Sequence, residues 1–230
     1  MPRRILIFCL FAAAAAMIFT RLGVWQLDRL HERQARNTTI AQQQRGAPLP
    51  LVSLPRDTAH AHFRAASVEG RYDYEHEIVL SNRTRRGSPG VDLVTPVRIA
   101  GSDTAVLVNR GWVYSPDGAS VDQRRWREGE TARLKGYVEV ITADTGLAIS
   151  RHPRVVRHVS RAEVSSKIPY PIALFYLVAF GDTTDLAHPA RRDLPVLDDG
   201  PHRGYAIQWF SFALIAIAGA GIVVRRERTG

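Results

Sequence analysis

The sequence predicts a membrane protein in which two transmembrane helices flank an extracytoplasmic, antiparallel β-rich domain with a barrel-like, α+β fold. Three observations lead to this prediction. The chain is apolar at both ends, and each apolar run carries arginine on its outer side. Between them, apolar residues alternate with polar ones over short segments that turn residues separate, as in half-buried strands.

The first apolar run, Ile5–Phe19, follows Arg3 and Arg4. A bilayer core of about 30 Å requires roughly 20 apolar residues in a helix. The run meets this requirement when it continues to Val24 with Arg21 snorkelling to the interface, so residues 5–24 are predicted as the first transmembrane helix. A cleaved signal peptide is the alternative, but the apolar residues that continue to Val24 favour an uncleaved anchor.

The second apolar run, residues 205–224, is long enough to span a bilayer and precedes Arg225, Arg226 and Arg228. Short basic flanks stay on the cytoplasmic side. Residues 1–4 and 225–230 are therefore predicted to be cytoplasmic. The apolar run starts too early to leave room for a mitochondrial transit peptide, which favours a multi-pass protein of the bacterial inner (plasma) membrane with a periplasmic central domain.

The central region divides into three predicted parts. Residues 25–45 lack proline and extend the first helix, residues 46–182 form the periplasmic β-rich domain, and residues 183–204 form a linker that returns to the membrane. Strands are predicted over 62–70, 77–83, 92–99, 104–113, 132–141, 153–160 and 168–180, with a short helix over 161–168.

Composition excludes several functions. The formal net charge is +9. Nucleic acid is not an expected partner, because the predicted domain lies across the membrane from it. Anionic lipid head groups or ligands that carry carboxylates are the expected partners of this positive charge. Cys9 is the only cysteine and Met1 and Met17 the only methionines, so one chain offers no thiolate copper site and no disulfide. No nucleotide-binding or catalytic motif is present. His60, His62 and His76 are interpreted as surface histidines rather than a metal site.

The membrane junctions carry the most informative pattern. Trp25 and Arg29 lie i, i+4 at the end of the first apolar run, with Arg21 a turn below. His202 and Tyr205 lie on one predicted helical face with Trp209, at i, i+3 and i+7. An aromatic belt with snorkelling arginines explains the aromatic residues. It does not explain the histidine one turn above them.

Four motifs resemble those of the surfeit locus protein 1 (Surf-one/Shy-one) family, assembly factors of cytochrome c oxidase. They are G-x-W-Q-x-x-R, G-x-[FY]-D, V-N-R-G-W and H-x-x-Y-A-x-x-W-F, and they occur in this order along the whole chain. The matching residues are Gly23, Trp25, Gln26 and Arg29; Gly70, Tyr72 and Asp73; Val108, Asn109, Arg110, Gly111 and Trp112; and His202, Tyr205, Ala206, Trp209 and Phe210.

The resemblance implies a non-enzymatic haem-binding chaperone of the respiratory chain that helps insert haem a into oxidase subunit I, working with the haem a synthesis machinery. It implies His202 as the axial ligand of the haem iron. Trp25, Tyr205 and Trp209 would contact the macrocycle, and Arg21, Arg29 or Arg203 would pair with its propionates. The alternative is a membrane scaffold that stabilises oxidase subunit intermediates and never carries haem.

Two departures from the family pattern limit this comparison. Gly200 and Pro201 replace a pair of asparagines before the histidine, and Arg33 replaces a lysine. Any role of those asparagines cannot be carried over to this chain. Within the β-rich domain, Gly111 is expected to lie against a close neighbour, and Trp112 is expected to pack in the core.

Overall fold

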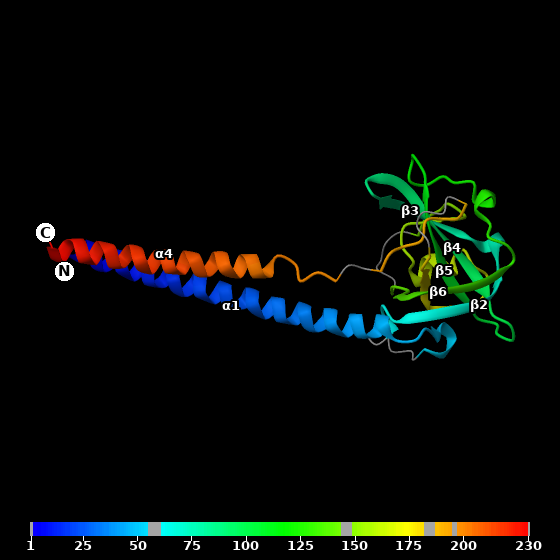
Figure 1. Cartoon of the computed structure of the whole chain (residues 1–230). Helices are drawn as coiled ribbons and strands as arrows, with labels where there is room; N and C mark the ends of the chain where they lie inside the picture. The colour runs from blue at the N-terminus through cyan, green and yellow to red at the C-terminus, as the bar shows by residue number, and fades with distance from the viewer. Residues whose placement is uncertain (1, 55–60, 144–148, 182–186, 195–196, 230) are drawn as a thin grey trace. The chain divides into compact units, whose positions relative to one another are not determined.

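The computed structural model describes residues 2–54, 61–143, 149–181, 187–194 and 197–229. The chain divides into two compact units (Figure 1). One comprises Met1–Thr39 and Val196–Gly230 and contains two long helices. The other comprises Ile40–Pro195 and contains the β-sheet.

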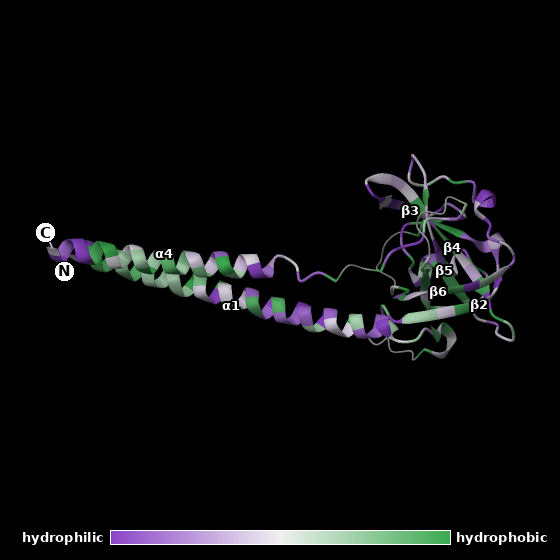
Figure 2. Ribbon diagram, in the orientation of Figure 1, coloured by the Kyte–Doolittle hydropathy of each residue, from purple (hydrophilic) through white to green (hydrophobic). Residues whose placement is uncertain are grey.

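The helical unit contains most of α1 (Arg3–Arg45) and all of α4 (His202–Thr229). Both helices are long and apolar enough to cross a membrane. Figure 2 shows hydrophobic residues along the first half of α1 and the middle of α4, whereas the second half of α1 is mainly hydrophilic. The polar half of α1 coincides with the helical extension predicted over residues 25–45.

A regular seam of buried residues joins the two helices. On α1, Ala16, Gly23 and Leu30 are buried and lie seven residues apart. On α4, Ala206 and Ala213 are buried at the same spacing. A seven-residue repeat keeps one stripe of a helix facing its partner, as in a coiled coil. Most of the stripe is small, and small side chains let helix backbones approach closely within lipid.

A closed five-stranded barrel forms the centre of the second unit (Figure 1). Its strands, in barrel order, are β2 (Ala65–Tyr72), β6 (Thr131–Val140), β8 (Ile172–Ala179), β5 (Ala105–Tyr114) and β4 (Ser88–Arg98). Pairing of Arg71 with Arg98 and of Tyr72 with Val97 joins β2 to β4 and closes the barrel. Closure leaves no exposed edge among these five strands.

Smaller elements surround the barrel. They are β1 (Leu49–Pro50), η1 (Leu51–Ser53), η2 (Tyr74–His76), β3 (Ile78–Arg85), η3 (Gln123–Trp126), β7 (Val155–Val156) and α3 (Arg161–Ser165). β3 extends the sheet beyond β4, and β7 pairs with β3. β3, β7 and α3 cover the outer face of the barrel strands with a second apolar cluster that includes Ile78, Val94 and Leu107.

The predicted barrel-like β-rich domain is confirmed, but its description as antiparallel is wrong in part. β5 and β8 pair in parallel, as do the short pairs β1–β2 and β3–β7. The parallel pair is possible because a long connection separates β5 from β8. The strand predicted over 153–160 is also shorter than expected, since only Val155 and Val156 belong to it.

β5 is buried on both faces. Val106 and Val108 point into the barrel interior, where they pack with Val138 and Leu177. Leu107 points the other way and packs in the outer cluster. Burial on both faces explains why the strand is a continuous apolar run rather than an alternating one. By the same alternation, Arg110 falls on the interior side, at the end of the barrel.

Candidate functional site

The stretch that follows β8 is docked onto β5. Residues 187–194, the strap, cross the strand at Trp112. The Ala190 amide donates to the Trp112 carbonyl and the Trp112 amide donates to the Ala190 carbonyl, both at 2.8 Å. Gly111 has φ +129°, and a Cβ there would lie 2.5 Å from the Ala190 oxygen. The prediction that Gly111 meets a close neighbour is therefore confirmed, and part of the predicted linker belongs to the β domain.

Arg110 is a fully buried cation at the end of the barrel. Its guanidinium donates to Glu77 at 2.6 Å and to Glu128 at 2.8 Å. Nε donates to the Thr95 hydroxyl at 2.7 Å, and Nη1 also donates to the Trp126 carbonyl at 2.6 Å. A buried charge is tolerated when it is paired and its remaining protons are hydrogen-bonded. The contacts of Arg110 meet this condition, so its role is to stabilise the fold.

The strap closes this buried network. Arg191 is buried, forms an ion pair with Glu128 and donates to the carbonyl of Arg110. The next residue, Arg192, pairs with Asp92 at 2.7 Å. Asp92 also accepts from the Asn109 amide at 3.0 Å. The V-N-R-G-W motif thus supplies the groups that hold the strap against the barrel.

Trp112 differs from its predicted place in the core. Its side chain is only partly buried, and it lines a pocket on the outside of the barrel. The indole Nε1 donates to the Arg83 carbonyl at 3.3 Å. A β-bulge explains the difference, because Val94 pairs with Asn109 and Leu93 pairs with Gly111, which leaves Arg110 as an extra residue in β5. The extra residue interrupts the alternation, so Trp112 lies on the opposite face of the strand from Arg110.

The G-x-Y-D motif closes the barrel seam. A side chain at Gly70 would overlap the carbonyl oxygen of Arg98 on β4. Tyr72 is buried in the interior cluster. Asp73 accepts from the Tyr170 hydroxyl at 2.5 Å and from the His76 ring at 2.8 Å. These partners lower the pKa of Asp73, although burial alone would raise it.

The two motifs at the membrane junctions meet within the helical unit. His202 is the first residue of α4, and its Nδ1 lies 2.8 Å from Oε1 of Gln26 on α1. Gln26 is buried, with an exposed fraction of 8%. Because an amide oxygen only accepts, this contact places the proton on Nδ1 and leaves the Nε2 lone pair available.

Aromatic packing supports this contact from one side. Gly23 lies against the ring of Phe210, where a Cβ would approach the ring carbons to 2.7 Å. Trp209 stacks on Phe19 with ring centroids 5.7 Å apart, and Phe212 also contacts Phe19 at 5.7 Å. Glycine at position 23 therefore permits the helix approach on which the His202–Gln26 contact depends.

Polar contacts support it from the other side. Arg33 on α1 donates to the Asp198 carbonyl at 2.9 Å and pairs with its carboxylate at 3.1 Å. Asn37 donates to the same carbonyl at 2.9 Å. Gly200 follows with φ +68°, and a Cβ there would lie 3.6 Å from Nε2 of His202. The lack of a side chain at position 200 keeps this edge of the imidazole open.

The structure brings together only some of the predicted site residues. Trp25, Tyr205 and Arg21 are exposed, and among the described residues none of them forms a hydrogen bond, ion pair or ring contact with His202. Arg29 lies over Trp25, 5.8 Å from its ring centroid, and pairs with Glu32 at 2.7 Å. Trp209 packs against Phe19 of α1 and not beside the His202 ring.

The histidines of the β domain are engaged separately. His62 pairs with Glu139 at 2.9 Å, and His76 pairs with Asp73. His60 lies outside the described residues. Across the part of the chain that the structure describes, no three His, Cys, Asp or Glu side chains gather as a metal site.

Sequence reasoning assigned no role to Gln26. The signal that could have identified it is its place in the buried seam, three residues after Gly23 and four before Leu30, where a polar residue in a tightly packed stripe needs a partner. The partner itself lies 176 residues away in the sequence.

Fold and motifs together define a class of protein in which two long apolar helices accompany a closed β-barrel domain. The model of the SURF1 family matches residues 13–214. The chain therefore belongs to the SURF1 family. An uncharacterized SURF1-like protein of Mycobacterium bovis is 27% identical over 233 residues, covering 93% of this chain and 83% of the relative. Surfeit locus protein 1 of Gallus gallus is 23% identical over 215 residues, covering 82% and 66%.

Proposed function

We propose that this protein is an assembly factor for haem-copper oxidase that binds haem a and assists its insertion into subunit I. It acts without enzymatic chemistry of its own and works beside the haem a synthesis machinery. Family membership and the four motifs support the oxidase role. The arginine flanks of both apolar helices support placement in a bacterial inner membrane, with the β domain periplasmic and both termini cytoplasmic.

The observation that carries the haem proposal is the His202–Gln26 contact. A ligating histidine ordinarily donates its second ring nitrogen to an oxygen, which sets the tautomer and the ring orientation. Gln26 supplies that oxygen at 2.8 Å. The residues therefore fit an axial ligand to haem iron. Bound haem would supply a flat apolar body with two carboxylates.

The exposed residues near the helix ends complete the proposed site. Trp25 is 48% exposed and Tyr205 is 47% exposed, which leaves aromatic surface for an apolar ring system. Arg21 and Arg29 are exposed cations that can pair with the propionates, Arg29 in exchange for its contact with Glu32. Trp209 supports His202 indirectly through its stack on Phe19.

Visible absorption of the full chain tests the proposal. In protein produced with haem a synthesis, His202→Ala is expected to abolish or shift the Soret band while membrane insertion persists. Gln26→Leu is expected to weaken haem affinity by about 10-fold to 100-fold through loss of ring orientation. His31→Ala is the matched control, because His31 lies on the exposed surface of α1. A colourless wild-type protein would support the non-haem scaffold.

A further inference from the structure

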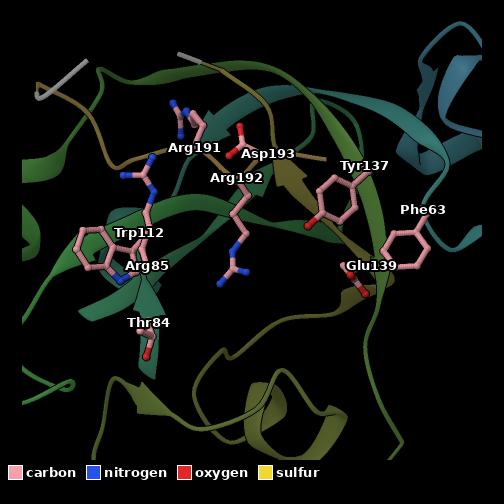
Figure 3. A pocket seen from close by; sticks show the side chains of 9 residues that line it. All are labelled: Phe63, Thr84, Arg85, Trp112, Tyr137, Glu139, Arg191, Arg192 and Asp193. Carbon is pink, nitrogen blue, oxygen red and sulfur yellow. The ribbon is translucent and has the colours of Figure 1, made fainter. Parts of the chain in front are cut away.

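A pocket of about 460 Å³ opens on the outside of the barrel, beneath the strap (Figure 3). It lies wholly within the β domain. Strands β3, β5 and β6 and the strap contribute its walls. The lining residues are Phe63, Thr84, Arg85, Trp112, Tyr137, Glu139, Arg191, Arg192 and Asp193.

Tyr137 directs a hydrogen-bond donor into this space. The residue is 5% exposed, and its ring packs against Phe63 and Phe180 with centroids 5.8 Å apart in each pair. Its hydroxyl points to the middle of the pocket in Figure 3 and has no hydrogen-bond partner among the described residues. Burial, and then the Glu139 carboxylate, raises the pKa of Tyr137 to about 12, so the hydroxyl keeps its proton at neutral pH.

Arg192 provides a fixed cation beside that hydroxyl. Its Nη2 donates to Asp92 at 2.7 Å, and Asp92 is itself buried and held by Asn109. The Arg192 side chain is 41% exposed, and its other N–H groups have no hydrogen-bond partner in the described part of the chain. Figure 3 shows the guanidinium in the centre of the pocket. The ion pair with Asp92 fixes the guanidinium of Arg192, and the N–H groups that Asp92 does not bind can donate to a ligand.

The remaining lining selects the kind of anion. Glu139 and Asp193 add negative charge, which disfavours a doubly charged phosphate more than a singly charged carboxylate. Trp112 and Phe63 lie on opposite sides of the donors in Figure 3, so aromatic surface flanks the charge. Arg85 lies 6.0 Å from the Trp112 ring centroid on the same side.

We propose that this pocket binds a carboxylate carried on an aromatic or other flat apolar group. Tyr137 and Arg192 hold the carboxylate, and Trp112, on one side of these donors, contacts the apolar part. The source is either a small aromatic acid or the C-terminal carboxylate of a polypeptide. The site goes beyond the haem proposal, because its lining residues belong to the β domain and do not include His202.

Binding is tested on the full chain in nanodiscs, with 5-fluorotryptophan incorporated and the Trp112 resonance assigned through Trp112→Phe. The probes are 3-phenylpropionate and its neutral isostere 3-phenylpropanamide. The acid is expected to shift the Trp112 signal with submillimolar affinity, and the amide to bind at least tenfold more weakly. Tyr137→Phe is expected to weaken the acid about tenfold, the loss of one charge-assisted hydrogen bond.

Tyr114→Phe is the matched control, since Tyr114 is 59% exposed and does not line the pocket. The acetylated peptide Ala-Ala-Phe and its C-terminal amide separate the two sources. If the peptide with a free C-terminal carboxylate binds tenfold tighter than 3-phenylpropionate, the natural ligand is a polypeptide C-terminus. If it binds equally or more weakly, the natural ligand is a small acid. Equal affinity for acid and amide, or an unchanged affinity in Tyr137→Phe, overturns the proposal. His202→Ala is expected to leave the affinities for 3-phenylpropionate and for the peptide unchanged.

Discussion

The buried cation of the β domain and the histidine of the helix pair belong to equally prominent motifs but have different surroundings. Arg110 is fully buried, and two carboxylates, a hydroxyl and a carbonyl accept its protons. His202 is partly exposed, and one of its two ring nitrogens is bound to Gln26. A residue whose bonding capacity is used up inside the protein stabilises the fold. A residue that is oriented and still has a free lone pair is available to a ligand.

The two units also differ in what holds them together. The β domain has apolar clusters inside and outside the barrel, and a buried ion-pair network at the end of the barrel. The helix pair has small residues, one aromatic stack and a few polar contacts at its end. In the membrane setting proposed for these helices, apolar burial does not drive helix association, so close packing and hydrogen bonds have to hold them together. The comparison predicts a graded series of mutational effects.

The largest effect is expected for Arg110→Met. It leaves Glu77 buried beside Glu128 without their shared cation, and removing one partner of a buried ion pair costs about 3–5 kcal/mol. Denaturant unfolding of the full chain measures the loss. Arg133→Met is the control, because the Arg133–Glu69 pair is exposed and such pairs contribute about 0–1 kcal/mol. Equal losses in the two variants would contradict a structural role for Arg110.

Gly111→Ala is expected to follow at about 2–3 kcal/mol, since a side chain at φ +129° is strained and would also displace Ala190. Limited proteolysis of the strap and thermal unfolding measure the effect. Gly101→Ala shares a positive φ of +73° but has nothing within 4 Å, so it isolates the backbone strain alone. The same loss in both variants would mean that strap docking contributes nothing.

Gly23→Leu is expected to separate the helix ends without unfolding the β domain, because the new side chain occupies the space of Phe210. In a Cys9→Ser background, the pair Gln26→Cys and His202→Cys reports the approach by disulfide formation. Adding Gly23→Leu is expected to lower the cross-linked fraction severalfold. Gly219→Leu is the control, since a Cβ at Gly219 meets nothing within 4 Å; unaltered cross-linking in Gly23→Leu would refute the packing described.

The smallest effect is a pH dependence at the barrel seam. Because the pKa of Asp73 is lowered in the folded protein, its contribution is complete above the unfolded value of 3.8 and is lost as pH falls through the folded value. Stability of the wild type is therefore expected to fall more steeply below pH 4 than that of Asp73→Asn. Thermal unfolding from pH 2 to pH 6 compares the slopes. Parallel curves would show that Tyr170 and His76 do not favour the carboxylate.

Local pattern was sufficient for much of this protein. The length of the apolar runs predicted α1 and α4, and alternation predicted β2 to β6 and β8 within a few residues of their ends. The run after residue 168 was assigned to a strand because prolines bound it, and β8 occupies it. These features depend on spacing within one segment, which the sequence displays directly.

Pairing between distant segments was not predicted. The parallel β5–β8 pair, the strap across Trp112 and the place of Trp112 outside the core all depend on which strand lies beside which. The sequence expectation groups Trp25, Tyr205 and His202 but does not include Gln26, which the structure places 2.8 Å from the His202 ring. Helical periodicity states which residues share a face of one helix, but not how that face turns toward another.

The sequence by itself determined the two apolar helices, the β-rich domain between them and the motifs that identify the family. Each of these features depends on residues that are adjacent or lie within a few helical turns of one another in the sequence. The tertiary structure decided which motif residues are structural and which remain available. That distinction depends on partners such as Glu77 for Arg110 and Gln26 for His202, which lie 33 and 176 residues away along the chain. Only packing brings such groups within hydrogen-bond distance.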